Sequence, residues 1–346
     1  MAAPTPAKTW QVEPNMVAVQ NGDEHDLARK LMQQFHEAVT GFSSNPWTVA
    51  ASSDGSTAGA PGPAGSDGSG FTDYTDWSWS TGSHSWIVYN HPSGAQILFD
   101  QKYTSGNCED NYVEASPGGN YSGFTSTSTA PTCTDPLDQG DVDGLVMLTN
   151  GGVNEPWWSG YATSGGFASV DLRHHVWHSS DGLVTWWVIY RANVCVAFWF
   201  FGDIADPRAG QTNPFAAGCM ANGGTSTPLE VLAGTIQNGY AWIRTNIGGT
   251  NYSFGLYGLG SIWVDATYAA VAEETDSQLQ VTEVTLVSGD SGARGNKGKL
   301  FDLWWTQDQV VNSGDTSPNN ASARDFVHFG CYMFPWTGDS TVPLIS

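Results

Sequence analysis

Three histidines lie close together in the sequence, at His174, His175 and His178, and are the first candidates for metal chemistry. Two histidines four residues apart share one face of a helix and can ligate a single zinc ion. The surrounding residues favour a β-strand instead, in which side chains four residues apart stand roughly 13 Å from each other. One zinc ion cannot bind both imidazoles at that separation without a bulge, so the sequence predicts strand and turn histidines and no metal site.

A second metal candidate is the acidic segment that contains Asp138, Asp141 and Asp143, followed by Gly144. Acidic residues at such spacing before a glycine are typical of the start of a calcium-binding loop. The glutamate that should close the loop is absent at the required position, and residues 145–148 favour a strand. We therefore expect a solvated acidic turn here, with no bound metal and no cofactor.

Hydrolytic chemistry finds weak support in the sequence. No five-residue window matches Gly-x-Ser-x-Gly, the pattern of a nucleophile elbow. Glu155 is the most suitable acid for glycan hydrolysis because aromatic residues follow it, but no second carboxylate stands nearby to complete the pair. Trp157 and Trp158 are candidates for stacking on a sugar ring or for packing in a core or subunit interface, and the second role is favoured. The sequence thus predicts no catalytic residues.

The overall composition limits the class of protein. The chain of 346 residues contains 41 Gly and 16 Trp but only 13% charged residues, which favours β-strands joined by many tight turns. Its 12 basic and 34 acidic residues give a net charge of −22, so we expect neither nucleic acid nor a membrane as a partner. The first residues lack the apolar segment of a signal peptide, and no apolar run approaches membrane-spanning length.

The five cysteines are scattered, and their odd number argues against a complete disulfide framework. Buried thiols are therefore the simplest interpretation. The best candidate for a disulfide bridge is Cys108 with Cys133, because both lie in a polar stretch rich in Ser, Thr and Gly.

Residues 1–45 are predicted to form an N-terminal arm and one amphipathic helix. Residues 1–20 are extended and interrupted by prolines, so they either dock on a neighbouring subunit or fray. From Asp23 to Thr40 an apolar residue recurs at every fourth position, which predicts a helix with one buried face, and Gly41 follows as its expected cap. The members of this apolar stripe are Leu27, Leu31, Phe35 and Val39.

Residues 46–346 are predicted to form one large, mainly β domain: an antiparallel sandwich or barrel-like sheets with long Gly/Ser/Thr-rich loops. A boundary near residues 222–236 would divide this domain into two subdomains. Between residues 168 and 201, three apolar segments separated by short turns predict an antiparallel meander. Its last two strands are apolar on both faces, so we expect both faces to be buried. The other predicted strands are 47–53, 85–89, 95–100, 240–246, 252–256, 261–268, 278–288, 300–306 and 326–334.

The segment Phe198-Trp199-Phe200-Phe201-Gly202-Asp203-Ile204 resembles an aromatic strand, ending in Phe-Gly-Asp, that many tailed-bacteriophage virion proteins carry. In that group it follows a Trp- and Tyr-rich segment, like 176–190 here, and leads into a turn like 206–210. Similar too are the helix followed by 47–55, a Gly-rich loop and the strand 85–88. Residues 294–304 resemble a segment with Arg-Gly and then Leu-x-x-Leu-Trp, in which Phe301-Asp302 replaces the usual Pro-Gly.

The resemblance implies a non-enzymatic structural subunit, present in multiple copies in the head, neck or tail of the virion. Its partners would be other virion proteins and copies of itself, and no catalytic residue or cofactor is implied. Long loops, an arm and exposed aromatic residues suit a subunit that contacts several neighbours. The alternative is a carbohydrate-binding or receptor-binding adhesin, with Trp157 and Trp158 on a host surface glycan. We expect synthesis in the bacterial host cytoplasm and final residence in the virion.

Overall fold

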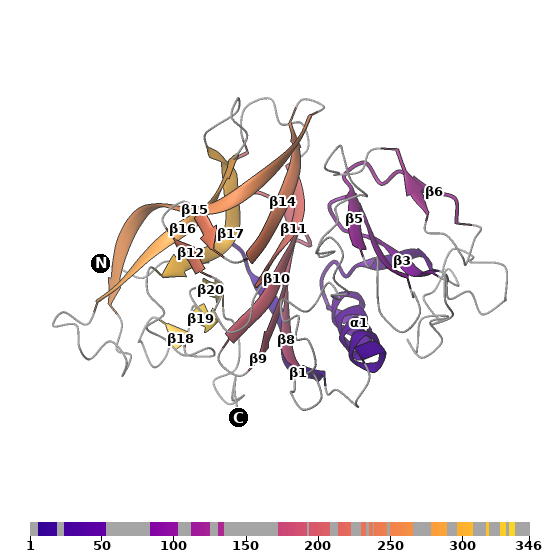
Figure 1. Ribbon diagram of the computed structural model, residues 1–346, viewed down its shortest axis with the longest axis horizontal. Helices are drawn as coiled ribbons and strands as arrows, with labels where there is room; N and C mark the ends of the chain where they lie inside the picture. The colour runs from indigo at the N-terminus through magenta and orange to yellow at the C-terminus, as the bar shows by residue number, and fades with distance from the viewer. Residues whose placement is uncertain are drawn as a thin grey trace.

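The chain is mainly β, with antiparallel sheets and a single helix in the part that the structure describes, which confirms the predicted fold class (Figure 1). No helix in that part combines the length and the apolar character needed to cross a bilayer. The structure is a computed structural model, and it describes residues 6–18, 24–52, 84–102, 112–124, 131–134, 172–191, 194–207, 214–222, 230–232, 235–237, 239–247, 250–265, 278–288, 296–306, 316–317, 326–329 and 332–335.

The largest sheet has twelve strands, each antiparallel to its neighbours. In spatial order they are β1 (Trp10–Ala18), β8 (Leu172–Ser179), β9 (Val184–Arg191), β10 (Val194–Asp203), β11 (Phe215–Asn222), β14 (Gly239–Ile247), β15 (Thr250–Asp265), β16 (Gln278–Ser288), β17 (Asn296–Thr306), β20 (Tyr332–Pro335), β19 (Phe326–Phe329) and β18 (Thr316–Ser317).

A second sheet contains four strands, and two further strand pairs are small. The four-stranded sheet has the order β2 (Thr48–Ser52), β3 (His84–Asn90), β4 (Gln96–Lys102) and β5 (Tyr112–Ser116). The pairs are β6 (Tyr121–Ser122) with β7 (Thr132–Cys133), and β12 (Glu230–Leu232) with β13 (Thr235–Gln237).

The N-terminal segment, predicted to be extended and either to dock on a neighbouring subunit or to fray, contains a strand of the chain's own large sheet. Residues 10–18 form β1, which pairs with β8 at the edge of the large sheet. The register shifts between Glu13 and Met16, around Pro14, since proline has no N–H to donate to the ladder. The backbone hydrogen bonds to β8 hold this segment in place. Because β8 is far away in the sequence, no local sequence pattern predicts this pairing.

The predicted helix is present as α1 (Glu24–Gly41). Phe35 and Val39, from the expected apolar stripe, are fully buried, while the side chains of Leu27 and Leu31 lie outside the described set. The helix ends at Gly41, where the sequence placed its cap, but the φ of Gly41 is not positive, so this residue does not adopt the left-handed conformation common at helix ends. The chain instead folds back so that the backbone N–H of Trp47 donates to the carbonyl of Val39 at 2.8 Å.

Most of the other predicted strands are confirmed. The expected hairpin forms between β3 and β4, and the long β15 contains the strand predicted at 252–256 and residues 261–265 of the strand predicted at 261–268. The segment predicted at 326–334 splits into β19 and β20. The ladder runs directly from β11 to β14 across residues 222–236, and the subdomain boundary there stays a prediction.

The predicted meander is confirmed as β8, β9 and β10, and it forms a central layer. Trp186 and Trp187 are successive residues of β9, so they point to opposite faces, and both are fully buried. Trp187 stacks on Phe35 of α1, with ring centroids 4.4 Å apart, whereas Trp186 packs edge-on against Phe334 of β20 at 5.5 Å. The central strands thus lie between α1 with the four-stranded sheet on one side and the C-terminal strands on the other (Figure 1).

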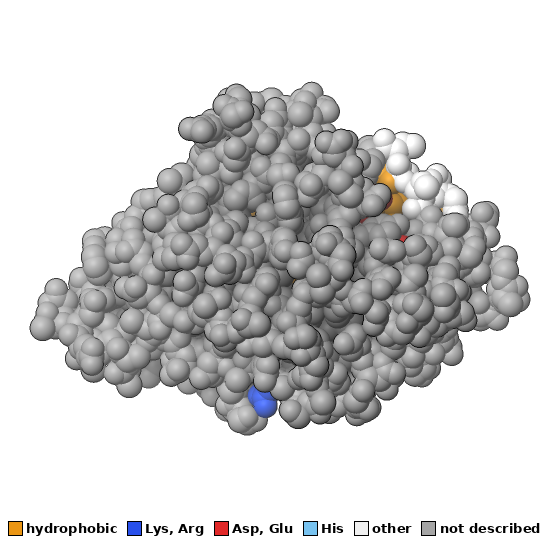
Figure 2. All heavy atoms as spheres, in the orientation of Figure 1, with side chains coloured by type: hydrophobic (Ala, Val, Ile, Leu, Met, Phe, Trp, Pro, Cys, Tyr) orange, Lys and Arg blue, Asp and Glu red, His pale blue; other side chains and the backbone are white. Residues whose placement is uncertain are grey.

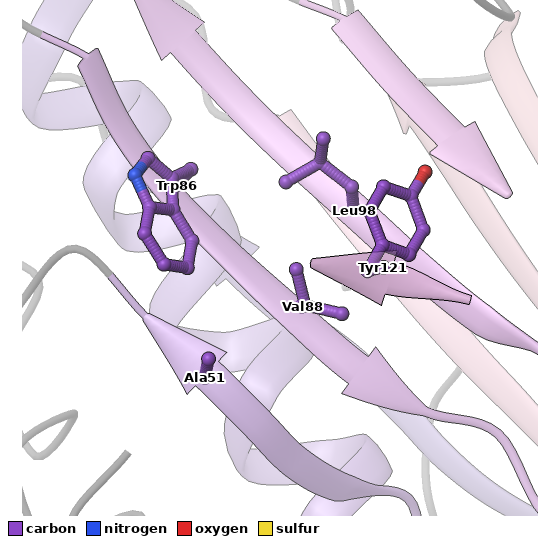
Figure 3. Close-up of a cluster of buried hydrophobic side chains, with 5 residues drawn as sticks. All are labelled: Ala51, Trp86, Val88, Leu98 and Tyr121. Atoms are coloured by element: carbon purple, nitrogen blue, oxygen red, sulfur yellow. The ribbon is translucent and has the colours of Figure 1, made fainter. Parts of the chain in front are cut away.

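The four-stranded sheet is also covered on both faces. Tyr89 and Phe99 face α1 and contact Phe35, while Val88 and Leu98 point to the opposite side. The second face forms an outer cluster, in which Tyr121 of β6 lies beside Leu98 and Val88 (Figure 3). This cluster is made of Ala51, Trp86, Val88, Leu98 and Tyr121, with Ala50, Phe124 and Cys133 packed against it. Hydrophobic atoms reach the surface near β6 (Figure 2).

Cys133 is half-buried in β7, where it packs against the outer cluster. Its predicted bridging partner, Cys108, lies outside the described residues, so the Cys108–Cys133 disulfide stays a prediction.

Gly202, in the Phe-Gly-Asp segment, sits where β10 meets the turn before β9. Its φ is 145°, a conformation that favours glycine, and a Cβ atom there would lie 2.2 Å from the carbonyl oxygen of Leu183. The next residue, Asp203, donates its N–H to that same oxygen at 2.9 Å. A glycine is therefore required for β10 to approach the β8–β9 turn this closely.

Replacement of Gly202 by alanine should destabilise the protein by about 2–5 kcal/mol, because a backbone clash adds to the backbone strain. Gly41→Ala is the matched control, since a Cβ atom at Gly41 would meet nothing within 4 Å and alanine favours helix by up to about 1 kcal/mol. Urea unfolding followed by tryptophan fluorescence measures both. Equal midpoints for the two variants would contradict this account of Gly202.

Candidate functional site

Buried indoles connect the layers through specific hydrogen bonds. Five of the described tryptophans donate their Nε1–H to an acceptor elsewhere in the chain: Trp10 to Asp302 Oδ2 at 2.7 Å, Trp47 to Thr185 Oγ1 at 3.1 Å, Trp177 to the Pro335 carbonyl at 2.5 Å, Trp186 to the Phe301 carbonyl at 3.2 Å, and Trp187 to His174 Nδ1 at 3.0 Å. An indole supplies a large apolar surface but needs a partner for its N–H when buried. These hydrogen bonds therefore determine how the layers align with one another.

His174 is a fully buried link between β8, β9 and α1. Its Nδ1 accepts the indole N–H of Trp187, so in the neutral ring the proton must reside on Nε2. Nε2 lies 2.6 Å from Oε1 of Gln34 and donates to it. Both ring nitrogens are thus engaged, and the tautomer is fixed by the neighbours.

His178 belongs to a chain of hydrogen bonds on the same face of β8. Trp47 donates to Thr185 Oγ1, Thr185 lies 2.8 Å from His178 Nδ1, and His178 Nε2 lies 2.7 Å from the carbonyl oxygen of Asn45. Because a carbonyl can only accept, Nε2 carries the proton and the Thr185 hydroxyl donates to Nδ1. Phe42 stacks on the imidazole at 5.1 Å.

The histidine environment strongly disfavours the charged imidazole. Burial lowers the pKa of His174 to about 3 and that of His36 to about 4. Burial also lowers the pKa values of His91 and His175 well below 6.5, and the charges of neighbouring histidines add to the effect. For His178, burial outweighs the opposing hydrogen bond to Asn45 and the charge of Asp181, and its pKa is lowered.

The prediction that the three clustered histidines lie on a strand and adjoining turn is confirmed by β8. His174 and His178 share the face that contacts α1 and the residues after it, whereas His175 lies on the other face, stacked on Trp177 at 5.3 Å. Within the described residues, no group of three or more His, Cys, Asp or Glu side chains could hold a metal ion. The engaged nitrogens of His174 and His178 suit support of the layers rather than proton transfer to a ligand.

A second cluster of polar contacts, the N-terminal junction, consists of Lys8, Trp10, Asp181, Phe301 and Asp302. At its centre, Asp302 accepts hydrogen bonds from the backbone N–H groups of Ala7 at 2.7 Å and Lys8 at 3.1 Å and from the indole of Trp10. Asp302 adopts a φ of 58°, a conformation that an acidic residue tolerates better than most. One carboxylate thereby holds the start of β1 against β17.

The ammonium of Lys8 completes this junction. It lies 2.5 Å from Oδ2 of Asp181 and 4.2 Å from the centroid of the Phe301 ring. Asp181 itself shapes the β8–β9 turn, since its Oδ1 accepts from the Ser179 hydroxyl at 2.6 Å and the Leu183 N–H at 3.1 Å. The N-terminal segment, this turn and the middle of β17 are thus held together.

Two further backbone contacts join β17 to the end of β10. Ala205 and Lys299 exchange both N–H···O=C bonds at 2.8 Å. Gly298, with a φ of 143°, allows this approach, because a Cβ atom there would lie 2.6 Å from Cδ1 of Ile204. The Phe-Gly-Asp segment and the 294–304 segment therefore contact each other directly.

The other candidates for metal binding, sugar stacking or catalysis are not among the described residues. Trp157, Trp158 and Glu155 lie outside the described residues, as do Asp138, Asp141 and Asp143. Sequence reasoning missed the N-terminal junction, because its residues are far apart in the sequence. No protein-family model matches the chain, and no curated protein matches it significantly in sequence.

Acid should destabilise the protein between pH 6.5 and about 4. In this window the histidines of the unfolded chain become protonated, whereas the same histidines stay neutral in the folded protein. The unfolded state therefore binds more protons, and the free energy of unfolding decreases as the pH is lowered. Each such histidine lowers the free energy of unfolding by about 1.4 kcal/mol per pH unit. His174→Gln, which keeps a donor and an acceptor, should reduce the slope by that amount in urea unfolding. A stability that is constant across this window would refute the assignment.

Asp302→Gly should destabilise the protein by about 1–3 kcal/mol, although glycine relieves the positive φ, because three donors lose their acceptor. Asp206→Gly is the matched control. Asp206 also has a positive φ, of 50°, but its side chain is 77% exposed, so we expect a change of less than about 1 kcal/mol. Thermal unfolding compares the two, and a neutral effect of Asp302→Gly would disprove the anchoring role.

Proposed function

We propose that this chain is a non-enzymatic structural subunit of a tailed-bacteriophage virion, present in multiple copies and contacting neighbouring subunits in the head, neck or tail. One observation carries the proposal: the segments that resemble such proteins, although far apart in the sequence, contact one another. A resemblance made of short pieces gains weight when the pieces form one packed unit.

The contacts among these segments are specific. Trp47, from the first segment, packs edge-on against Phe201 of the Phe-Gly-Asp segment, with ring centroids 5.5 Å apart, and binds Thr185 of the Trp- and Tyr-rich segment. Gly298 and Lys299, from the last segment, contact Ile204 and Ala205 directly after Phe-Gly-Asp. Asp302 has a positive φ, as the glycine of the usual Pro-Gly could readily adopt. The resembling segments therefore pack against one another in the central layers.

The roles of the aromatic residues and histidines also suit a structural subunit. The largest fully buried side chains in the described residues are mostly tryptophans, which are used between layers. The imidazoles of His174 and His178 are engaged at both nitrogens by other groups of the chain. The histidines that could act as acids or bases are thus engaged in holding the fold together.

The alternative, a receptor-binding or carbohydrate-binding adhesin, depends on Trp157 and Trp158. Tryptophans used for sugar stacking must expose a ring face, which Trp47, Trp177 and Trp187 do not, as they are buried. We therefore favour the structural role. The two roles would coincide in a subunit at the tip of the tail, which would contact both its neighbours and a glycan.

The structural role predicts that the chain co-purifies with intact virions at a constant copy number. Quantitative mass spectrometry across gradient fractions of particles measures this ratio, with a major capsid protein as the internal standard. The isolated chain should not bind host cells, because neighbouring subunits are its partners. Absence from intact particles would overturn the proposal, and binding of the isolated chain to glycans that is lost in Trp157→Ala or Trp158→Ala would establish the adhesin.

A further inference from the structure

The closest side-chain contact in the N-terminal junction pairs a nucleophile with a carboxyl group. Nζ of Lys8 lies 2.5 Å from Oδ2 of Asp181, although the two residues are 173 positions apart in the sequence. The Lys8 side chain is only 10% exposed and its Nζ is placed over the Phe301 ring. Both partners are therefore held in position by the fold rather than meeting by chance at a flexible surface.

The two oxygens of the Asp181 carboxylate have different partners. Oδ1 accepts two hydrogen bonds, from Ser179 and Leu183, and these donors would stabilise negative charge on that oxygen as a tetrahedral centre forms. Oδ2 is left toward Lys8. The arrangement thus distinguishes one oxygen that stays from one oxygen that can leave.

A second acid stands in the same neighbourhood. Asp203 donates its backbone N–H to Leu183, two residues after Asp181, and its charge interacts with those of both Lys8 and Asp181. Burial raises the pKa of Asp203, and the negative charge of Asp181 adds to this against the opposing charge of Lys8. A carboxyl group that is more easily protonated is suited to passing protons between an amine and a leaving oxygen.

We propose that Lys8 and Asp181 become joined by an intramolecular amide bond between Nζ and Cγ. Nζ, after giving up a proton, attacks Cγ; the Nζ–Cγ bond forms, the Cγ–Oδ2 bond breaks, and Oδ2 leaves as water. The two protons lost from the ammonium leave with that water. One of these protons travels from Nζ to Oδ2 by way of solvent and the Asp203 carboxyl group, so Asp203 ends unchanged, and no oxidant, cofactor or other co-reactant is consumed.

The reaction starts from the ion pair between Lys8 and Asp181. Stabilisation of this ion pair slows the reaction, because Nζ must lose a proton before it can attack. Burial raises the pKa of Asp181, but hydrogen bonds from Lys8, Ser179 and Leu183 outweigh that effect and the pKa is lowered, which favours the charged pair. The fixed geometry works in the other direction, because well-oriented intramolecular groups react with effective molarities of about 10⁵–10⁸ M. The side chain of Asp181 is 47% exposed, so the water formed can escape.

The bond would tie the N-terminal segment to the β8–β9 turn. β1 is the edge strand of the large sheet, and hydrogen bonds to Asp302 and to the backbone of β8 and its following turn hold its start. A covalent link next to this position would prevent the edge strand from detaching. This inference concerns the chain itself and does not depend on the proposed function.

Peptide mass spectrometry of the purified full-length chain tests the bond. Trypsin cannot cleave after an acylated lysine, so the product should be a branched peptide in which residues 1–29 are joined to residues 174–191, with the mass of one water lost. Lys8→Arg is the matched control, because it keeps the positive charge but lacks the primary amine, and it should give residues 1–8, 9–29 and 174–191 as separate peptides. Asp203→Asn should form the bond at least ten times more slowly after refolding.

Each result decides a part of the proposal. Recovery of residues 1–8 and 174–191 as separate, unmodified peptides from the folded wild-type chain would show an ion pair only, and would overturn the proposal. Circular dichroism of the variants shows whether they fold. A folded Asp203→Asn chain that becomes linked as fast as the wild type would overturn the role given to Asp203.

Discussion

The burial of β8–β10 on both faces is the constraint on which the rest of the structure depends. Successive bulky residues such as Trp186 and Trp187 point to opposite sides, so each side needs its own apolar layer. Burial of a large apolar side chain stabilises a fold by about 1.5–3 kcal/mol, and only a layer on each face makes that gain available twice. α1 with the four-stranded sheet supplies one layer, and the C-terminal strands supply the other.

This double burial also dictates where polar groups go. An indole N–H or an imidazole inside the stack has little access to water, so a partner on a neighbouring strand or in the facing layer stabilises it. The donation from Trp186 to the Phe301 carbonyl and the donation from His174 to Gln34 are examples on the two faces. Polar contacts of this kind add little net energy but leave few alternative alignments of the layers, since a shifted layer would leave buried donors without acceptors.

Local patterns made much of the fold predictable. The four-residue apolar spacing around Phe35, the hairpin between β3 and β4 and the meander of β8–β10 each depend on neighbours in the sequence, and each is confirmed. β1 and the N-terminal junction were not predictable, because Asp302 binds groups 292 to 295 residues away. The spacing of His174 and His178 correctly indicated a strand, but their partners come from α1, the residues after it and β9. The expectations for Trp157 and Trp158 stay predictions.

Hydrogen–deuterium exchange in the native state tests the central role of the doubly buried strands most directly. If β8–β10 form the layer on which the others depend, their amides should exchange only through global unfolding, with a free energy equal to that from urea unfolding. Peptides from β12 and β13, a separate two-stranded pair, should exchange through smaller openings. Exchange of the β9 amides at a free energy well below that of global unfolding, with either outer layer still protected, would contradict this account.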